Sequence, residues 1–435
     1  MKLFIIFFPL LLLLFSCSFN KDKKIDLDIF KKQGEKIDIF ESKNTFDKEI
    51  NTNLILQFTQ PQLNKKWFYE HFSSNNYYEH FFYDGKFDDI FKKNIGDYID
   101  KKNDNGSLLV LENFIFFSDQ KGSIYKFDLN NEKIIWELKV HEKSYNNYPK
   151  NIALFLNKDV LYGADNLGFI YSIDTQTGKI IWQQNYGVPF ASHINFYQDV
   201  LYVVNQNSRL YAFSSSNGQK IWSFEGLSGL VKPSRSSNVS INNNKLIFSN
   251  DLGDLTVIDL NQQSVLWSIN IFSTNRIFSN FFTKISNILI DKNNVYVSSN
   301  GGDLLNFNLE NGDINWSKKV SSTQNHVITD KYLFVLTEDG FIIAFNKLDG
   351  NILWSLNLSL FSKEKSSKEK EYYGLILASN NLYATSSNGE IYKISAINGK
   401  YISHIKISNQ LSRAPIIVNN KMLFLNHSSE LITIN

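Results

Sequence analysis

The sequence predicts an all-β fold: an eight-bladed β-propeller whose blades are four-stranded antiparallel sheets. Three observations favour this fold. A hairpin signature occurs eight times, a second signature built around tryptophan follows each copy but the last, and successive copies of the second lie 38 to 49 residues apart. That spacing accommodates four strands of about five or six residues with their turns, which is one propeller blade.

The hairpin signature begins with a small turn residue. Apolar residues follow two and five positions later, and Asp, Asn or Ser stands six positions later. A short apolar run precedes the turn residue, so we expect this residue to join two strands of a hairpin. The polar residues that end the second strand are interpreted as turn residues that bond to the backbone, rather than as catalytic acids. The eight turn residues are Gly122, Gly168, Ser208, Gly253, Gly302, Gly340, Gly389 and Ser429.

The second signature places a turn glycine four residues before a tryptophan, as in Gly178 and Trp182. Trp136 and Trp267 lack this glycine, and Ser403 replaces the tryptophan in the seventh copy. A tryptophan repeated at one place in each blade is expected to pack between neighbouring sheets and to bury roughly 150–250 Å². We prefer this structural role to a cofactor-stacking one. The predicted docking residues are Trp67, Trp136, Trp182, Trp222, Trp267, Trp316 and Trp354.

The two ends of the repeat predict how the ring closes. Eight hairpins are followed by only seven outer strands, so the last blade lacks one strand. The segment around Trp67 has the same polar-then-tryptophan pattern, and we expect it to pair with Glu430 to Asn435 and to close the last blade. Closure would remove exposed strand edges. The alternative is a seven-bladed ring with a loose eighth hairpin.

The N-terminal segment predicts export and lipid attachment. The apolar run Leu3–Phe15 is too short to span a membrane but has the length of a signal-peptide core. Its end, up to Cys17, resembles the bacterial lipobox, which predicts palmitate on Cys17. Ser18 after the cysteine favours the outer membrane, with the protein facing the periplasm. The alternatives are an uncleaved signal anchor and an ordinary signal peptide.

These patterns divide the chain into three parts. Residues 1–16 are predicted as the signal peptide, residues 17–62 as a lipid-anchored tether and residues 63–435 as the propeller. The tether assignment rests on an abundance of Lys, Asp and Asn without a sustained apolar period.

Composition and charge exclude several function classes. The 435 residues carry 45 Lys and Arg against 43 Asp and Glu, a net charge of +2 that disfavours nucleic-acid binding. The single cysteine excludes an internal disulfide framework and a thiolate metal cluster. The pairs Glu70–His71 and Glu79–His80 are the closest approach to a metal-ligand set, but a polar, aromatic-rich loop explains them better. We therefore predict no catalytic residues, no metal and no cofactor.

The stretch from Asp174 to Trp182 resembles the tryptophan-docking motif of quinoprotein-type propellers. Together with the lipobox and the N-terminal strand, it makes the chain similar to the BamB family of outer-membrane assembly lipoproteins. The resemblance implies a non-catalytic scaffold of the BAM complex. Such a scaffold binds BamA and other assembly components and assists unfolded outer-membrane proteins.

Two other classes of function stay open at this point. One is a quinone-dependent dehydrogenase on the same fold, although Cys17 alone cannot supply the disulfide between adjacent cysteines that many such enzymes carry. The other is an envelope propeller that binds a cell-wall polymer or a different protein.

Three connectors are candidates for partner binding because loops vary without disturbing the sheets. For the aromatic-rich insertion at residues 70–102 the sequence leaves two roles open, which are binding a substrate chain and capping the channel. The resemblance implies that the connectors Glu225 to Ser237 and Phe272 to Phe282 contact BamA. The alternative is that their side chains fold onto the blade edges. The candidate partner-binding residues are Leu227, Leu230, Arg235, Asn275 and Arg276.

Overall fold

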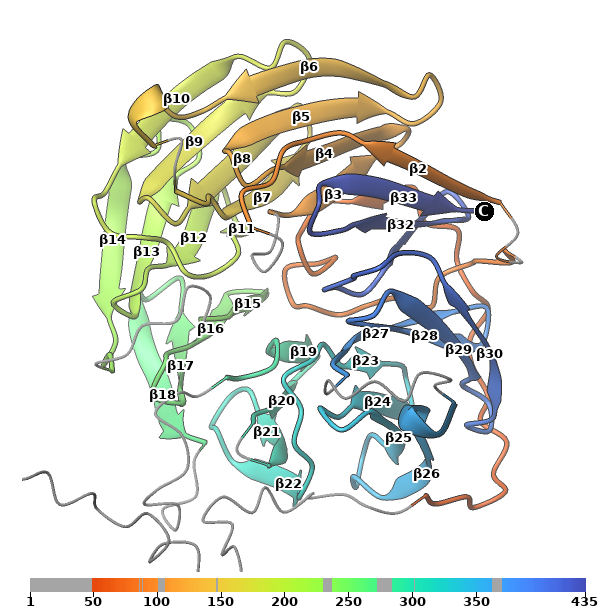
Figure 1. Ribbon diagram of the computed structural model, residues 1–435. Coiled ribbons are helices and arrows are strands. Elements are labelled where there is room, and N and C mark those ends of the chain that lie inside the picture. Colours follow the sequence, from red (N-terminus) through yellow and green to blue (C-terminus); the bar gives the residue numbers. More distant parts are fainter. Residues whose placement is uncertain are drawn as a thin grey trace, which may run out of the picture. The chain divides into compact units, whose positions relative to one another are not determined.

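Eight antiparallel sheets are arranged around a central channel, as the repeat predicted (Figure 1). The computed structural model describes residues 49–435 apart from 86, 88, 101–105, 146–147, 230–236, 272–283, 301 and 362–369. The predicted signal peptide, Cys17 and most of the predicted tether lie outside the described residues. Among the described residues, no helix has the length and apolar character needed to cross a membrane.

Blades 1 to 7 follow one another along the chain, each running from an inner strand at the channel to an outer strand at the rim (Figure 1). Blade 1 contains β3 (Leu108–Leu111), β4 (Phe114–Ser118), β5 (Ser123–Asp128) and β6 (Lys133–Lys139), and blade 2 contains β7 (Ile152–Asn157), β8 (Val160–Asp165), β9 (Phe169–Asp174) and β10 (Ile180–Asn185). Blade 3 contains β11 (Asn195–Tyr197), β12 (Val200–Val204), β13 (Arg209–Ser214) and β14 (Lys220–Glu225), and blade 4 contains β15 (Val239–Asn242), β16 (Lys245–Ser249), β17 (Asp254–Asp259) and β18 (Ser264–Asn270).

The second half of the ring repeats this arrangement. Blade 5 contains β19 (Leu289–Asp291), β20 (Asn294–Ser298), β21 (Leu304–Asn308) and β22 (Ile314–Lys318), and blade 6 contains β23 (Val327–Ile328), β24 (Tyr332–Leu336), β25 (Phe341–Asn346) and β26 (Ile352–Asn357). Blade 7 contains β27 (Tyr372–Ala378), β28 (Asn381–Ser386), β29 (Glu390–Ser395) and β30 (Tyr401–Lys406), and blade 8 contains β31 (Ile416–Val418), β32 (Lys421–Leu425), β33 (Glu430–Ile434) and β2 (Ile90–Asn94). Two short 3₁₀ helices, Lys143–Tyr145 and Leu358–Phe361, lie in connectors.

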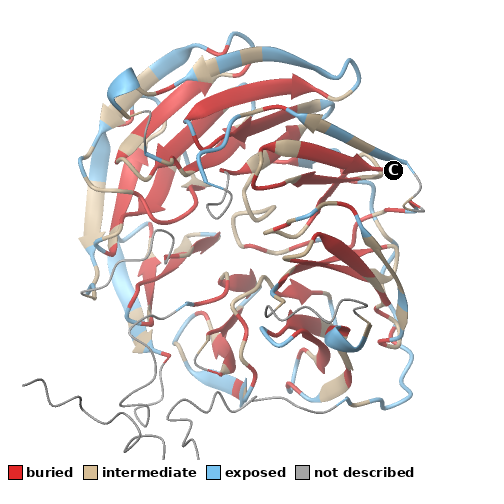
Figure 2. Cartoon of the chain, in the orientation of Figure 1, coloured by how far each residue is buried: buried red, intermediate tan, exposed pale blue. Residues whose placement is uncertain are grey.

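The core lies between neighbouring blades. The middle strands are buried on both faces because each blade is covered by the blade on either side, so β12 is apolar throughout and buried at four of its five residues. The outer strand β14 has no fully buried residue. Figure 2 shows this gradient, with buried residues in the inner three strands and exposed residues at the rim.

The turn residues of the hairpin signature share one backbone conformation. All eight have positive φ, from 56° at Ser429 to 93° at Gly302. Glycine adopts this conformation without steric cost, which explains its prevalence at these positions. The polar residue before the turn also stabilises the turn conformation. In blade 2, the Asp165 carboxylate accepts hydrogen bonds from the backbone N–H groups of Leu167 (2.8 Å) and Phe169 (3.0 Å).

The glycine and the tryptophan of the second signature contact different blades. Trp136 of blade 1 lies on Gly178 of blade 2, and its Nε1–H donates to the Thr175 carbonyl at 3.0 Å. Trp182 makes the same contact with Gly218 of blade 3 and donates to the Ser215 carbonyl at 3.0 Å. Each glycine therefore receives the tryptophan of the preceding blade. The other contacts of this kind pair Trp267 with Gly312, Trp316 with Gly350 and Trp354 with Gly399.

Two blades keep the turn conformation without glycine. Glu132 and Gln263 occupy the position four residues before Trp136 and Trp267, and both have positive φ, 51° and 53°. The turn geometry of the outer hairpin is therefore shared even where the sequence signature is incomplete.

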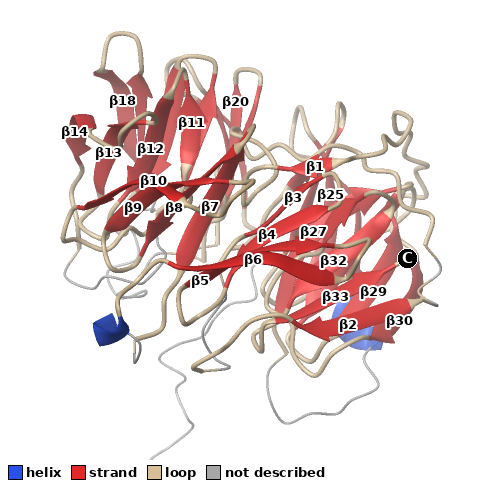
Figure 3. Ribbon diagram, turned by 90° about the horizontal axis from the view of Figure 1, so that it is seen from above, coloured by secondary structure: helices blue, strands red, loops and turns tan. Residues whose placement is uncertain are grey.

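The strand beside β33 differs from the one predicted. β2 pairs antiparallel with β33 over its whole length, from Ile90 opposite Ile434 to Asn94 opposite Glu430, and lies next to it in both views (Figure 1, Figure 3). β1 (Lys66–Trp67) pairs instead with the inner strand β3. The prediction that the Trp67 segment pairs with Glu430 to Asn435 was wrong. A polar-then-tryptophan pattern fits an inner edge as well as an outer one, and β2 carries neither signature residue.

The described end of the predicted tether contacts the propeller. The Ile50 carbonyl accepts a hydrogen bond from the backbone N–H of Ser355 at 2.8 Å, and the Leu56 N–H donates to the Ile397 carbonyl at 2.9 Å. Leu56 is buried against blades 6 and 7. Residues 49–56 are therefore held along two blades.

Candidate binding site in the central channel

A segment that includes the first part of the aromatic-rich insertion lies in the channel and contacts the blades in order around the ring. It begins at blade 8, where the Asn64 side chain donates to the Ile417 carbonyl at 2.9 Å. Trp67 then pairs with β3 of blade 1. The Phe68 carbonyl next accepts the N–H of Leu156 in blade 2 at 3.0 Å.

The same segment continues across blades 3 to 5. The Ser74 carbonyl accepts hydrogen bonds from the Asn195 side chain of blade 3 (2.7 Å) and from the Ile241 N–H of blade 4 (2.8 Å). The Asn75 carbonyl and side-chain amide both bond to the backbone of Ile290 in blade 5 at 3.0 Å. Each contact pairs polar groups that would otherwise be unsatisfied at the inner edge of a sheet.

The segment ends at blades 6 and 7 and returns to its own beginning. The Tyr78 hydroxyl accepts a hydrogen bond from Asn325, just before β23 of blade 6, at 2.9 Å. The Phe81 N–H donates to the Leu377 carbonyl of blade 7 at 3.1 Å. Gln62 bonds to the backbone of residues 80 and 82, so the two ends of the segment pair. We call residues 62–83 the central loop.

The central loop lies at one end of the channel. Most of its backbone contacts fall where the inner strands end and turn into the second strands, as at Leu156, Ile241 and Ile290. The connectors between blades lie at the opposite end. Of the two roles left open for the insertion, the geometry of this part corresponds to a cap on the channel.

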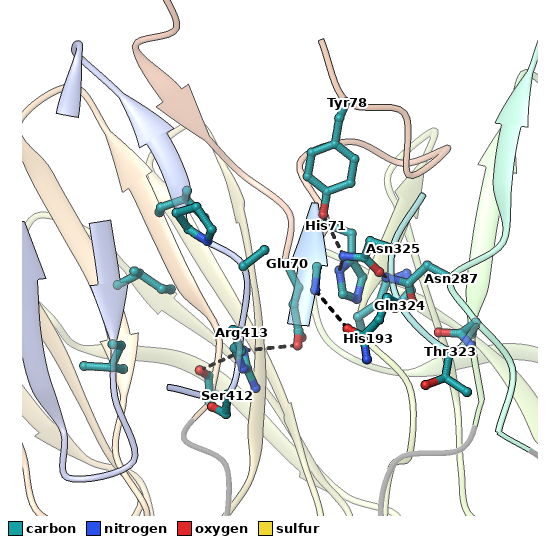
Figure 4. A pocket seen from close by; sticks show the side chains of 18 of the residues that line it. Glu70, His71, Tyr78, His193, Asn287, Thr323, Gln324, Asn325, Ser412 and Arg413 are labelled. Carbon is teal, nitrogen blue, oxygen red and sulfur yellow. Dashed lines mark hydrogen bonds and ion pairs between the residues drawn. The ribbon is translucent and has the colours of Figure 1, made fainter. Parts of the chain in front are cut away.

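A cavity of about 260 Å³ lies between the central loop and these connectors (Figure 4). Its floor is formed by Trp67, Glu70, His71 and Tyr78 of the central loop. Its walls come from the starts of the inner strands and the connectors that precede them, which contribute residues distant in sequence, such as His193, Asn287, Gln324 and Arg413.

Among the described residues, Glu70 and Arg413 form an ion pair in the cavity. Arg413 Nη1 lies 3.4 Å from Glu70 Oε1 and donates to the Gly106 carbonyl at 3.3 Å. The other Glu70 oxygen accepts a hydrogen bond from the Ser107 hydroxyl at 2.9 Å. The Glu70 side chain is 7% exposed and the Arg413 side chain 30%, so the cation is the more accessible partner. The Arg413 backbone is fixed by Thr385, whose hydroxyl donates to its carbonyl at 2.8 Å.

An amide network forms the opposite wall. Asn325 donates to the Tyr78 hydroxyl, lies 3.3 Å from His71 Nδ1 and accepts a hydrogen bond from Asn287. The His71 ring meets the His193 ring edge to face, with the centroids 4.9 Å apart. Burial raises the pKa of Tyr78, so its hydroxyl is neutral at physiological pH. These side chains are held in fixed positions by one another.

The weak metal candidate from the sequence does not form a common site. Glu70 is committed to Ser107 and Arg413, whereas the His80 ring donates to the Thr59 carbonyl at 2.7 Å and accepts the Asn380 N–H at 2.9 Å. Burial lowers the pKa of His80. In the part of the chain that the structure describes, no group of three or more His, Cys, Asp or Glu is placed to hold a metal ion.

The predicted partner-binding residues are only partly described. Leu227 follows β14 in the connector between blades 3 and 4 and is 72% exposed. Leu230, Arg235, Asn275 and Arg276 lie outside the described residues. Of these two connectors the structure describes residues 226–229, which follow β14.

The residues that line the cavity were not predicted from the sequence as a site. Trp67 was assigned to blade docking, but it lies in the central loop among Phe72, Tyr78 and Phe81, with ring centroids 5.0 to 5.8 Å away. Arg413 and Asn325 carry no local signature, since they stand singly in connectors. The only signal was the unusual length and aromatic content of the insertion after Trp67.

Many solved structures resemble this chain, and three of them illustrate the range. BamB from Moraxella catarrhalis matches with 14% identity and a TM-score of 0.61, covering 79% of this chain and 99% of that one. The computationally designed Ika8 protein matches with 12% identity and a TM-score of 0.59 over 76% and 96% of the two chains. Quinohemoprotein alcohol dehydrogenase from Comamonas testosteroni matches with 10% identity and a TM-score of 0.65, covering 85% and 80%. At these identities the likeness shows the fold alone.

The sequence comparisons are more selective. No curated protein matches the chain. Residues 120–356, more than half of the chain, match the family model described as outer membrane protein assembly factor BamB. These residues run from the first hairpin turn into the outer strand of blade 6. The chain therefore belongs to the BamB family of PQQ-like β-propellers.

Proposed function

We propose that this protein is a non-catalytic scaffold of the outer-membrane β-barrel assembly machinery. In this role it binds BamA and helps unfolded barrel precursors reach it. The observation that carries the proposal is the family match over more than half of the chain, together with the eight-bladed ring. We also propose that palmitate on Cys17 anchors the protein to the outer membrane, facing the periplasm.

The geometry of the connector between blades 3 and 4 supports a partner surface there. Leu227 exposes most of its side chain, whereas the neighbouring Gly229 is tied to the propeller by its N–H, which lies 3.0 Å from Asp251 Oδ1. A connector fixed at its base with an exposed leucine suits an interface anchor. The aliphatic side chain gains most when a partner removes it from water.

The contacts within the channel favour the scaffold role over the quinone-dependent alternative. A calcium-bound quinone requires carboxylate and amide ligands around an open channel. Here the carboxylate of Glu70 is paired with Ser107 and Arg413, and the central loop contacts all eight blades. The family's non-catalytic role agrees with this arrangement.

Co-purification tests the proposal. The lipidated protein is purified from solubilised envelopes, and the proteins that accompany it are identified by mass spectrometry. Recovery of BamA supports the scaffold role. A cytochrome or a different envelope protein in its place would contradict it and favour one of the alternatives.

A variant series locates the surface. Leu230→Ala combined with Arg235→Ala is expected to weaken BamA binding by roughly 30-fold to 1000-fold, which corresponds to about 2–4 kcal/mol. Leu227→Ala tests the described part of the same connector. The matched control is Leu360→Ala, because Leu360 is 66% exposed on the connector between blades 6 and 7. Equal binding by all variants at unchanged melting temperature would remove this connector from the interface.

The lipid anchor has its own test. Cys17→Ser should abolish labelling with radioactive palmitate and release the protein into the soluble periplasmic fraction. Retention of the unlabelled variant in the outer membrane would show that another contact anchors it.

A further inference from the structure

We propose that the channel cavity binds a small organic carboxylate with a short aliphatic body, such as the C-terminal end of a peptide. Arg413 and Lys284 would hold the carboxylate, and an aliphatic wall would hold the body. The proposal goes beyond the scaffold role, since it concerns a ligand inside the ring and not a partner on the connectors.

The charges that line the cavity favour an anionic ligand. Lys284 and Arg413 are cationic, whereas Glu70 is the one carboxylate among the lining residues that the structure describes. Among the described residues, the Lys284 ammonium has no ion-pair partner. A bound carboxylate would place an anion beside these two cations without displacing Glu70.

The ion pair in the cavity is long enough to admit a second acceptor. Arg413 Nη1 and Glu70 Oε1 are 3.4 Å apart, compared with about 2.7–2.9 Å for a close charge-assisted hydrogen bond. Glu70 has its closer contact with Ser107, at 2.9 Å. The guanidinium is planar, carries five N–H donors that can serve more than one acceptor, and is the more exposed partner, so the proposed carboxylate binds beside Glu70 and the other groups that Arg413 contacts.

Neutral donors on the walls are oriented in advance. The Gln324 side-chain carbonyl accepts the Gly374 N–H at 3.0 Å, which fixes the amide plane and leaves the two donors on Nε2 for a ligand. Ser412, next to Arg413, also lines the cavity (Figure 4). Donors held by the protein favour a ligand that accepts hydrogen bonds, because little entropy is lost when they bind.

The remaining walls are aliphatic and limit the size of the ligand. Leu108, Ile285, Leu411 and Leu423 line the cavity, and the last three are almost fully buried. The volume of about 260 Å³ is slightly below the range of roughly 300–1,000 Å³ for drug-sized ligands. The cavity therefore suits a terminal residue with an aliphatic side chain rather than a long segment.

Calorimetry with three probes tests the proposal. N-acetyl-Ala-Leu with a free carboxylate is expected to bind, and its C-terminal amide is expected to bind at least 10-fold more weakly. The third probe, 4-methylpentanoate, presents the same carboxylate and aliphatic group without a peptide. Tighter binding of the peptide acid than of 4-methylpentanoate assigns the site to chain ends, whereas equal binding assigns it to small free acids.

Variants connect the binding to the named side chains. Arg413→Gln is expected to reduce the affinity for the acid at least 10-fold, to the level of the amide. Arg209→Gln is the matched control, because Arg209 forms an ion pair with Glu225 at the rim and should not affect binding. If Arg413→Gln fails to fold, Lys284→Gln provides the same test on an exposed residue.

Two results would overturn the proposal. The first is equal affinity of the folded wild-type protein for the acid and the amide, which includes no measurable binding of either. The second is binding of the acid that neither Arg413→Gln nor Lys284→Gln weakens. Neither result affects the scaffold role, because co-purification with BamA measures that separately.

Discussion

Gly178→Ala tests the contact that joins consecutive blades. A Cβ at this position would lie 2.7 Å from Cδ2 and 2.9 Å from Cγ of Trp136, and the residue has a φ of +69°. Alanine would therefore incur backbone strain and would also displace the indole. Gly187 provides a matched control, because it has the same φ of +69° but no atom within 4 Å of the added Cβ.

The structure separates the two costs. Strain in the left-handed region is about 1–2 kcal/mol for either substitution. At Gly178, overpacking against Trp136 adds about 1–3 kcal/mol. Loss of the hydrogen bond from Trp136 to the Thr175 carbonyl adds about 1 kcal/mol. We expect a loss of roughly 1–2 kcal/mol for Gly187→Ala and about 3–6 kcal/mol for Gly178→Ala.

Urea denaturation monitored by tryptophan fluorescence measures both variants against the wild type. The midpoint should shift much further for Gly178→Ala, with a similar slope, because the same surface is exposed on unfolding. Equal losses for the two variants would refute the reasoning, since only the strain common to both would then contribute.

Three further changes examine other parts of the structure. Trp67→Ala should lower the free energy of unfolding by about 3–5 kcal/mol, because Trp67 is 1% exposed. Trp222→Ala should lower it less, because Trp222 is half-buried. The reverse order in denaturation experiments would contradict the central role of the loop. Replacing β2 with alternating Gly and Ser should lower stability by about 2 kcal/mol through lost strand pairing, and an unchanged midpoint would contradict the pairing with β33. Burial lowers the pKa of His326 to about 3, so between about pH 6.5 and pH 3 the unfolded chain binds a proton that the folded chain does not. The free energy of unfolding should therefore fall as the pH decreases through this range, by up to about 1.4 kcal/mol per pH unit. His326→Asn should flatten this part of the stability profile measured by denaturation at each pH, and an identical profile would assign the pH dependence to other groups.

Local chemistry made most of the fold predictable. The hairpin turns require positive φ, and glycine or serine at a fixed place before an apolar pair marks each of them, as at Gly122 and Ser429. The spacing of the tryptophans gave the number of strands in a blade. The sequence predicted that tryptophans such as Trp136 pack between neighbouring blades. Only the structure shows that each turn glycine contacts the tryptophan of the preceding blade.

The strand next to β33 could not be identified in this way. Ile90–Asn94 carries neither a tryptophan nor a turn glycine, and its residues alternate between exposed and half-buried. An outer strand with little burial imposes few demands on its sequence, so several segments fit the place equally well. The Trp67 segment was preferred because of its local pattern, and tertiary contacts placed it on the channel side of blade 1.

The sequence by itself therefore determined the repeat, the hairpins and the number of blades, because these depend on residues a few positions apart. Only the tertiary structure decided which N-terminal strand lies beside β33, the course of the central loop and the cavity above it. Glu70 and Arg413 are 343 positions apart, and neither has a neighbour in sequence that indicates its partner. They meet because the ring returns the last connector to the side of the first blade, and this closure is a property of the whole chain.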